Sequence, residues 1–396
     1  MNNKDLIALS DKYIMGTYKR FPVVLTKGQG TKVWDSDGKE YLDFVAGIAV
    51  CSLGHSNPKV VAAIKDQANT LTHVSNLYYI GAQIKYASLL VPKTFGDKVF
   101  FCNSGAEANE AAIKLARKYG NENMSVKRNE IITMKSSFHG RTLATITATG
   151  QEKFQKGFEP LPEGFRYIPF NDLDSLKTAI TDKTCAVMLE PIQVEGGIRV
   201  PDNEYLAGVR KICDDHDLLM ILDEVQVGMG RTGRLFAYEH DSVKPDIMTL
   251  AKAIGNGFPM GAMVATDRVA SIFEPGSHAS TFGGNPLAMS AAYAVLEIML
   301  EEGFLENVER VGRYFKDHLT ELQAKHGMIV DVRGKGLILG VEMDREVAGI
   351  IRECLDRGLL VASAGPNVLR FVPPLTVTEN EIDQALQILD GILEEQ

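Results

Sequence analysis

The amino-acid sequence predicts an α/β protein with a mainly parallel sheet in a large domain and a smaller α+β domain at its C-terminal end. Across residues 60–285, helical stretches alternate with short apolar runs at 98–102, 130–134, 186–189, 218–222 and 247–250. This alternation is typical of a parallel sheet covered by helices on both faces. The 396 residues also allow two or three lobes, at roughly 150 residues a domain.

Asn285 and Pro286 mark the predicted boundary between the lobes, because they offer a cap and a first-turn proline for a helix that reaches Glu302. We therefore expect a large domain at 60–285 and a small domain at 286–396. The N-terminal segment, 1–59, should pack with the small domain.

The sequence of the C-terminal lobe predicts a mixture of strands and helices. Apolar runs predict strands at 337–342 and 368–372, and a helix at 346–356 should close at Gly358. Thr378 and Glu381 form a capping box for a last helix. The apolar stripe of that helix consists of Ile382, Ala385, Leu386, Leu389, Ile392 and Leu393.

Composition excludes several classes of function. Lys and Arg number 42 against 51 Asp and Glu, so the net charge is −9, and without a basic run we expect no nucleic-acid partner. The five cysteines include no CxxC pair and no metal-binding spacing, which fits a reducing compartment. We see neither a signal peptide nor a membrane-spanning run, and we expect a cytoplasmic protein with no metal.

Two charged residues stand at the ends of predicted strands. Asp223 follows the run 218–222, and Lys252 follows 247–250 before a glycine-rich turn. Ligands of open α/β sheets bind beyond the carboxyl ends of the strands, and a lysine among apolar walls becomes a nucleophile toward aldehydes because its pKa falls. A single aspartate or lysine in such a position is more often a surface residue. The presence of both, at the ends of two predicted strands, favours a functional site.

A third strand end supplies small residues. After the run 98–102, Ser104, Gly105 and Ala106 open a helix that runs to Gly120, and the free amides of a helix start suit a phosphate. Ser104 and Glu107 also match a plain capping box that needs no ligand. A phosphate cradle, an amine and a carboxylate around one crevice are what pyridoxal 5'-phosphate (PLP) requires.

The chain resembles the class III aminotransferases of fold type I nearly end to end, and within them most closely those that act on acetylornithine. The motifs that carry the resemblance begin at Thr17 (TYKRFPVVL), Val33 (VWDSDGKEYLDF), Leu53 (LGHSNP), Phe101 (FCNSGAEANE), Phe138 (FHGRT), Asp223 (DEVQ) and Ser280 (STFGGNP). So many motifs in the right order are very specific. The resemblance implies a PLP enzyme with Lys252 as the lysine that bonds the cofactor and Asp223 as the partner of the ring nitrogen.

The same resemblance implies roles for residues that hold the cofactor. Gly105 and Ala106 would bind the phosphate, Phe138 would stack on the pyridine ring and Val225 would back its other face. Gln226 would contact the ring hydroxyl. Thr281 would reach the cofactor of a neighbouring subunit, so the resemblance implies a homodimer with shared sites.

The resemblance also implies residues that bind the substrates: an arginine that holds the donor's carboxylate, and an arginine–glutamate pair, called the gate below, whose pairing depends on which substrate is bound. Arg141 would hold the carboxylate of acetylornithine, with Ser280 near the same end. Arg370 would bind the α-carboxylate of glutamate and 2-oxoglutarate, and Glu195 would pair with it when the amino donor is bound. The implied reaction turns N2-acetyl-L-ornithine and 2-oxoglutarate into N-acetylglutamate 5-semialdehyde and glutamate, in arginine biosynthesis. Ala279 departs from the glycine expected there, which would strain the backbone if φ were positive.

Other interpretations stay open. The donor could be succinylornithine, ornithine, γ-aminobutyrate or an acyl-lysine. Intact Lys252, Asp223, Arg141 and Arg370 argue against a non-catalytic PLP-binding protein. A racemase, mutase or decarboxylase on the same fold would not need the Glu195–Arg370 pair, so that pair favours a transaminase. The segment 228–233 matches GxGxxG, but neither a following helix nor an acid about 20 residues on supports a dinucleotide site. The run 214–217 (DDHD) more often ends a helix in water than binds a metal. His139 has an open role between catalysis and packing.

Overall fold

The computed structural model describes residues 1–124 and 126–396, and its centre is a seven-stranded sheet. The strand order is β4 (Lys98–Cys102), β10 (Gly261–Ala265), β9 (Ile247–Leu250), β8 (Leu219–Asp223), β7 (Thr184–Leu189), β5 (Glu130–Met134) and β6 (Phe165–Ile168). Neighbours from β9 to β6 pair in parallel, whereas β10 is antiparallel to both β9 and β4. The mainly parallel sheet is confirmed, and all five predicted strands form.

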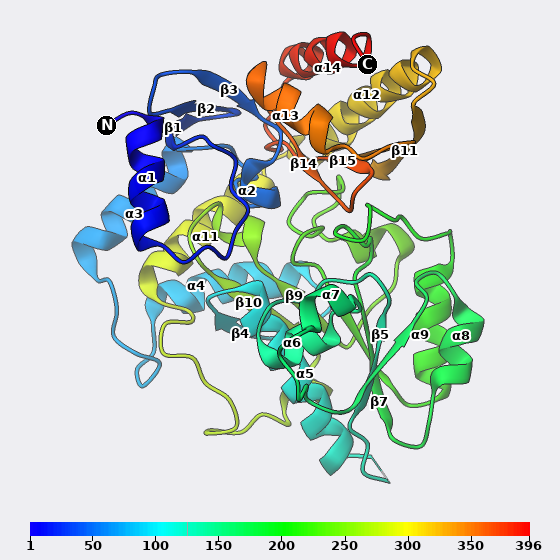
Figure 1. Cartoon of the computed structure of the whole chain (residues 1–396). Helices are drawn as coiled ribbons and strands as arrows, with labels where there is room; N and C mark the ends of the chain where they lie inside the picture. The colour runs from blue at the N-terminus through cyan, green and yellow to red at the C-terminus, as the bar shows by residue number, and fades with distance from the viewer. Residues whose placement is uncertain (125) are drawn as a thin grey trace.

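Helices cover both faces of this sheet, as the apolar runs predict (Figure 1). Leu219 and Ile221 of β8 belong to the hydrophobic cluster beneath α5 (Gly105–Glu122), whereas Met220 and Leu222 belong to the cluster that includes α9 (Tyr205–Asp215). Successive side chains of a strand point to opposite faces, so each face of a fully apolar strand is buried. With both faces covered, a ligand is expected beyond the carboxyl ends of the strands.

Shorter helices and turns connect these layers. They are α1 (Asn3–Tyr13), α2 (Ala46–Ala49), α3 (Pro58–Thr70), α4 (Gly81–Leu90), α6 (Leu143–Ala148), α7 (Glu152–Gln155), α8 (Leu173–Ala179), α10 (Asp267–Ala270) and α11 (Pro286–Met299), with 3₁₀ turns η1 (Val91–Lys93), η2 (Ala237–Asp241) and η3 (Lys252–Gly255).

The C-terminal part forms a second sheet with its own helices, at the top of Figure 1. The order is β11 (Ile329–Lys335), β12 (Ile338–Met343), β15 (Val368–Phe371) and β14 (Ala362–Ser363), packed with α12 (Phe304–Lys325), α13 (Ala348–Asp356) and α14 (Glu379–Leu393). The smaller α+β unit is thus present. The Thr378–Glu381 capping box forms, and the apolar stripe of α14 is buried.

A third sheet joins the two ends of the chain. Strands β1 (Leu25–Gln29), β2 (Lys32–Asp35) and β3 (Glu40–Asp43) form a meander, and β13 (Leu359–Leu360) pairs in parallel with β3. The N-terminal strands therefore share a sheet with the C-terminal unit. Helix α11 begins as predicted, with Asn285 Oδ1 accepting from Ala288 N at 3.0 Å, but it ends at Met299 rather than Glu302.

The segment 228–233 has a structural role instead of the phosphate-binding one. The 3₁₀ turn η2, and no α-helix, follows it. Arg231 is fully buried and donates hydrogen bonds to the carbonyls of Leu337 and Pro373 and to Ser52 Oγ. This side chain joins the N-terminal segment, the large sheet's loops and the C-terminal unit.

Two further predictions concern the surface and the cysteines. Helix α9 ends at Asp215, and residues 214–217 are exposed, with Asp214 paired to Arg210 and Asp215 to Lys211. Within the described residues, no helix has the length and apolar character needed to cross a membrane. All five cysteines are free thiols.

Candidate active site

A cavity of about 390 Å³ lies where the strands β4, β8 and β9 end. Its lining includes, among others, Ser104, Gly105, Ala106, Phe138, Arg141, Asp223, Val225, Gln226 and Lys252. Nine residues singled out from the sequence therefore meet in one cavity. The open edge of a parallel sheet is the expected place for a ligand in this class of fold.

Lys252 stands at the end of β9 in an unusual backbone conformation. Its φ is 47°, in the left-handed region that residues other than glycine rarely adopt, and such strain gathers at functional sites. Burial lowers the pKa of the Lys252 amine to about 8, against the opposing charges of nearby carboxylates. A substantial neutral fraction of the amine is therefore present near neutral pH.

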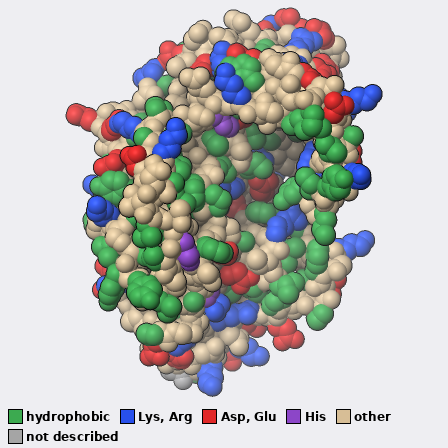
Figure 2. Space-filling view, turned by 90° about the vertical axis from the view of Figure 1, so that its left-hand side faces the viewer, with side chains coloured by type: hydrophobic (Ala, Val, Ile, Leu, Met, Phe, Trp, Pro, Cys, Tyr) green, Lys and Arg blue, Asp and Glu red, His purple; other side chains and the backbone are tan. Residues whose placement is uncertain are grey.

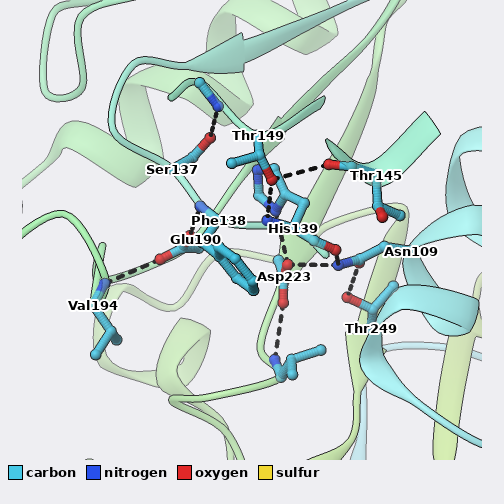
Figure 3. A network of polar contacts seen from close by, with 12 residues as sticks. Asn109, Ser137, Phe138, His139, Thr145, Thr149, Glu190, Val194, Asp223 and Thr249 are labelled. Atoms are coloured by element: carbon cyan, nitrogen blue, oxygen red, sulfur yellow. Dashed lines mark hydrogen bonds and ion pairs between the residues drawn. The ribbon is translucent and has the colours of Figure 1, made fainter. Parts of the chain in front are cut away.

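Asp223 is held by a buried polar network (Figure 3). Its Oδ2 atom accepts from Asn109 Nδ2 and contacts His139 Nδ1, both at 2.7 Å, and its Oδ1 accepts from Val225 N at 3.0 Å. Thr249 Oγ1 donates to Asn109 Oδ1 at 2.7 Å and thereby fixes the amide. The carboxylate is thus oriented by groups from α5, the 138–140 loop and β9.

Gly105 begins helix α5 against the Asp223 loop. A Cβ atom at this position would lie 2.8 Å from Val225 Cγ1, so only glycine fits. Ser104 Oγ accepts from Glu107 N at 3.1 Å, whereas the Glu107 carboxylate accepts from Asn103 N. The capping box is thus only half formed. The first amides of α5 have no acceptor within the helix and are available to an anion.

Phe138 is fastened to the cavity wall through its backbone. Its amide donates to Glu190 Oε1 at 2.7 Å, while Glu190 Oε2 accepts from Val194 N at 3.0 Å. Burial raises the pKa of the Glu190 carboxyl to about 7, an effect that His139 partly opposes. Glu190 therefore joins the Phe138 loop to the loop that carries Glu195.

Arg370 and Glu195 form an ion pair beside the cavity rather than in its lining, with Arg370 buried and Glu195 partly exposed. Gln226 Oε1, from the lining, accepts from Arg370 Nη1 at 3.2 Å. Burial alone would raise the pKa of Glu195, but the charges of Arg370 and Lys252 bring it below its ordinary value. The charge of Lys252 therefore interacts with the Glu195–Arg370 pair.

The remaining predicted residues differ in their placement. Arg141 is exposed at the cavity, with its guanidinium 3.9 Å from the Phe154 ring centroid, and no ion pair joins it to a carboxylate in the described part of the chain. Ser280 Oγ instead contacts Asn103 Nδ2 at 3.1 Å, outside the lining. Thr281 is exposed, away from this chain's cavity. The φ of Ala279 is not positive, so the condition for backbone strain at that position is not met.

Sequence reasoning missed two residues of the site. Glu190 directly follows β7, as Asp223 follows β8, so the same rule about strand ends could have found it. Asn109 is 1% exposed on the apolar side of α5, and a lone polar residue on that side was the available signal. Across residues 1–124 and 126–396, no three His, Cys, Asp or Glu side chains are arranged to hold a metal.

The residues present fit PLP in charge and shape. A desolvated amine suits the aldehyde, a fixed carboxylate suits a protonated ring nitrogen, and helix amides suit the phosphate. Gly105 leaves open the space that the amides need, because a side chain there would meet Val225. His139 Nε2 is buried and has no hydrogen-bond partner among the described residues.

Comparison with known proteins agrees with this chemistry. The family model for class-III aminotransferases matches residues 13–393. An acetylornithine aminotransferase of Caldanaerobacter subterraneus subsp. tengcongensis is 59% identical, covering 98% of this chain and 99% of its own, and one of Methanocaldococcus jannaschii is 51% identical, covering 100% and 99%.

Solved structures are similar over the whole chain. The ornithine aminotransferase of Toxoplasma gondii has a TM-score of 0.96 at 34% identity, covering 100% of this chain and 97% of its own. The N-acetylornithine aminotransferase of Stenotrophomonas maltophilia has a TM-score of 0.84 at 42% identity, covering 98% of both. Another structure of the Toxoplasma enzyme is described with PLP at its active site. The chain therefore belongs to the class-III aminotransferases, which are PLP-dependent enzymes.

Proposed function

We propose that this aminotransferase transfers the δ-amine of N2-acetyl-L-ornithine to 2-oxoglutarate, forming N-acetylglutamate 5-semialdehyde and glutamate in arginine biosynthesis. One observation carries the proposal: the Lys252 cavity has an unpaired guanidinium, Arg141, and adjoins a paired one, Arg370. Two carboxylate grips beside one amine suit two different carboxylate-bearing substrates. Two relatives that are 59% and 51% identical and are named acetylornithine aminotransferases support the donor.

PLP, when bound, supplies an aldehyde and an electron-accepting ring. In our proposal the Lys252 amine would hold PLP at its aldehyde and would carry the substrate proton, a role that its lowered pKa favours. Asp223 would keep the ring nitrogen charged. Phe138 and Val225 would lie on the two ring faces, Gln226 would contact the ring hydroxyl, and the amides at Ser104, Gly105 and Ala106 would bind the phosphate.

The gate consists of Glu195 and Arg370. With the amino donor in place, Glu195 neutralises Arg370, and Arg141 binds the donor's carboxylate. With glutamate or 2-oxoglutarate in place, Glu195 moves aside and Arg370 takes the α-carboxylate. The burial of Arg370 supports this exchange, because an unpaired guanidinium at 3% exposure is costly and needs one anion or another.

We further propose a cytoplasmic homodimer whose sites are shared through Thr281. Large hydrophobic side chains are exposed, among them Leu77 at 84%, Tyr79 at 96% and Phe282 at 60%. Figure 2 shows a face hollowed between its upper and lower parts, with hydrophobic side chains along the rim. Exposed apolar surface of this extent is typical of an interface.

The paired β3 and β13 support our division of the chain into 1–59, 60–285 and 286–396, with the first segment packed on the last.

The decisive experiment is a donor panel with 2-oxoglutarate, read as kcat/KM for glutamate formed. Acetylornithine should exceed succinylornithine, γ-aminobutyrate and an acyl-lysine. Free ornithine is the second candidate, because the Toxoplasma ornithine aminotransferase has a TM-score of 0.96. A clear preference for free ornithine would overturn the acetylornithine assignment.

The mechanism has its own test. Lys252→Ala should lose turnover by several orders of magnitude, on the order of the loss of a covalent nucleophile. The matched control is Lys244→Ala, since Lys244 is an exposed lysine in the same part of the chain. Undiminished turnover in Lys252→Ala would refute the role of this lysine.

A further inference from the structure

Three residues form one row across the C-terminal sheet. Arg333 of β11 pairs with Gly340 of β12, and Gly340 pairs with Arg370 of β15. Residues that face one another across strands point to the same side of a sheet. The two arginines therefore project from the same face, two strands apart or about 10 Å at the usual strand spacing.

The loop that carries Glu195 lies across this row. Gln193 and Arg199 close the loop through a pair of backbone hydrogen bonds, at 3.0 and 2.8 Å. Ile198 covers the middle of the row, because a Cβ atom at Gly340 would lie only 3.2 Å from Ile198 Cβ. Glycine at 340 thus lets the loop approach the sheet between the two arginines.

Arg333 grips the backbone of the loop. Its Nε donates to Gly197 O at 2.9 Å and to Ile198 O at 3.1 Å, and its Nη2 donates to Gly197 O at 2.6 Å. Asp331 Oδ2, at 2.8 Å, and Glu342 bind Nη1 on the other side. The guanidinium is therefore oriented by acids of its own sheet and aimed at the two carbonyls.

One sheet thus holds the loop at both ends, by its backbone at Arg333 and by the Glu195 carboxylate at Arg370. Arg333 touches neither the cavity lining nor Glu195 itself. Because Arg333 binds the loop through backbone carbonyls and not through Glu195, its contacts do not depend on the Glu195–Arg370 ion pair. It therefore limits how far the loop can move when the ion pair opens.

We propose that Arg333 is a positioning residue that holds the Glu195 loop against the Arg370 strand and so sets the balance between the two half-reactions. The proposal rests on the gate described above. We call the hydrogen bonds from Arg333 to the backbone of the Glu195 loop the clamp. Without the clamp, Glu195 neutralises Arg370 less often, and the freed Arg370 guanidinium favours substrates with an α-carboxylate. The donor half-reaction loses efficiency, while the glutamate half-reaction keeps it.

The experiment compares single-turnover rates of the holoenzyme with acetylornithine alone and with glutamate alone, followed by the absorbance of the bound cofactor. In Arg333→Gln, the ratio of kcat/KM for acetylornithine to that for glutamate should fall about tenfold, equivalent to the loss of one charge-assisted hydrogen bond. Gly340→Ala, whose Cβ would crowd Ile198 at 3.2 Å and so shift the loop slightly, should lower the same ratio while keeping Arg333 intact.

Arg128→Gln is the matched control. Arg128 Nη1 also donates to a backbone carbonyl, that of His216 at 3.0 Å, but near the amino end of β8, opposite Asp223. Its ratio should stay unchanged. A general loss of stability would lower both half-reactions together, so the ratio separates positioning from folding.

Glu195→Gln distinguishes the clamp from the gate. If it shifts the ratio and a folded, cofactor-loaded Arg333→Gln does not, the clamp is refuted and the gate stands. If Glu195→Gln leaves the ratio unchanged, the gate itself fails. A shift in both variants, with none in Arg128→Gln, supports the proposal.

Discussion

Lys252 combines a strained backbone with a buried amine, and the second feature makes its reactivity depend on pH. The amine attacks an aldehyde only when neutral, and burial brings its pKa to about 8. The rate at which cofactor-free protein captures PLP should therefore rise about tenfold for each pH unit below that pKa and level off above it.

Stopped-flow absorbance on mixing the cofactor-free protein with PLP measures this rate. An exposed lysine has an ordinary pKa of about 10.4, so its rate would keep rising past pH 9. A profile without a plateau below pH 9 would contradict the desolvated amine.

Asp223 gives a second prediction at this scale. Asn109 donates to its Oδ2 at 2.7 Å, and a hydrogen bond to a charged group contributes about 1.5–3 kcal/mol. Asn109→Ala should weaken PLP binding by roughly ten- to a hundredfold, because the carboxylate loses its orientation. Equilibrium dialysis measures the affinity. Asn123→Ala serves as the control, since Asn123 caps the far end of the same helix.

At the scale of elements, the loop 228–233 holds three parts of the chain together. Arg231 reaches Ser52, Leu337 and Pro373, and burial lowers its pKa to about 9. Arg231→Met keeps most of the volume but leaves two buried carbonyls unpaired, at about 1–3 kcal/mol each. The free energy of unfolding should fall by a few kcal/mol in urea titration. An unchanged midpoint would show that the carbonyls find other donors.

The strands that the sequence predicts in the large sheet are mostly apolar segments. Residues 98–102, 130–134 and 247–250 coincide with β4, β5 and β9, since short, mainly apolar segments between polar or glycine-rich stretches favour strands. Strand β10 was missed because Gly261 and its small neighbours carry a weak strand signal. Helix α11 stops three residues early, a usual uncertainty at helix ends.

For the site, strand ends point to Asp223 and Lys252, because topology alone brings them together. The φ of Lys252 and the row of Arg333, Gly340 and Arg370 depend on tertiary packing and strand register, which no local pattern encodes. The pairing of Arg370 with Glu195 was expected only from family resemblance. The structure adds the contacts that connect the pair to the cavity through Gln226.

At the scale of the whole molecule, the proposed dimer can be tested by combining two inactive variants in one dimer, because a site shared between subunits takes residues from both. Thr281 is exposed and lies outside its own cavity, so in our proposal it serves the partner's phosphate. Thr281→Glu should repel that phosphate and inactivate the homodimer, and Lys252→Ala inactivates it as well. Neither defect changes the fold of the large sheet.

A hybrid dimer of one Lys252→Ala subunit and one Thr281→Glu subunit contains one site with both native residues. Differently tagged subunits, co-expressed and purified through both tags, should therefore recover about half of the wild-type activity, because one of two symmetric sites is intact. If Thr281 instead served its own subunit, every site of the hybrid would carry a defect. Activity no higher than that of the Thr281→Glu homodimer would then refute the shared site, whereas recovery requires that a residue cross from one subunit to the other.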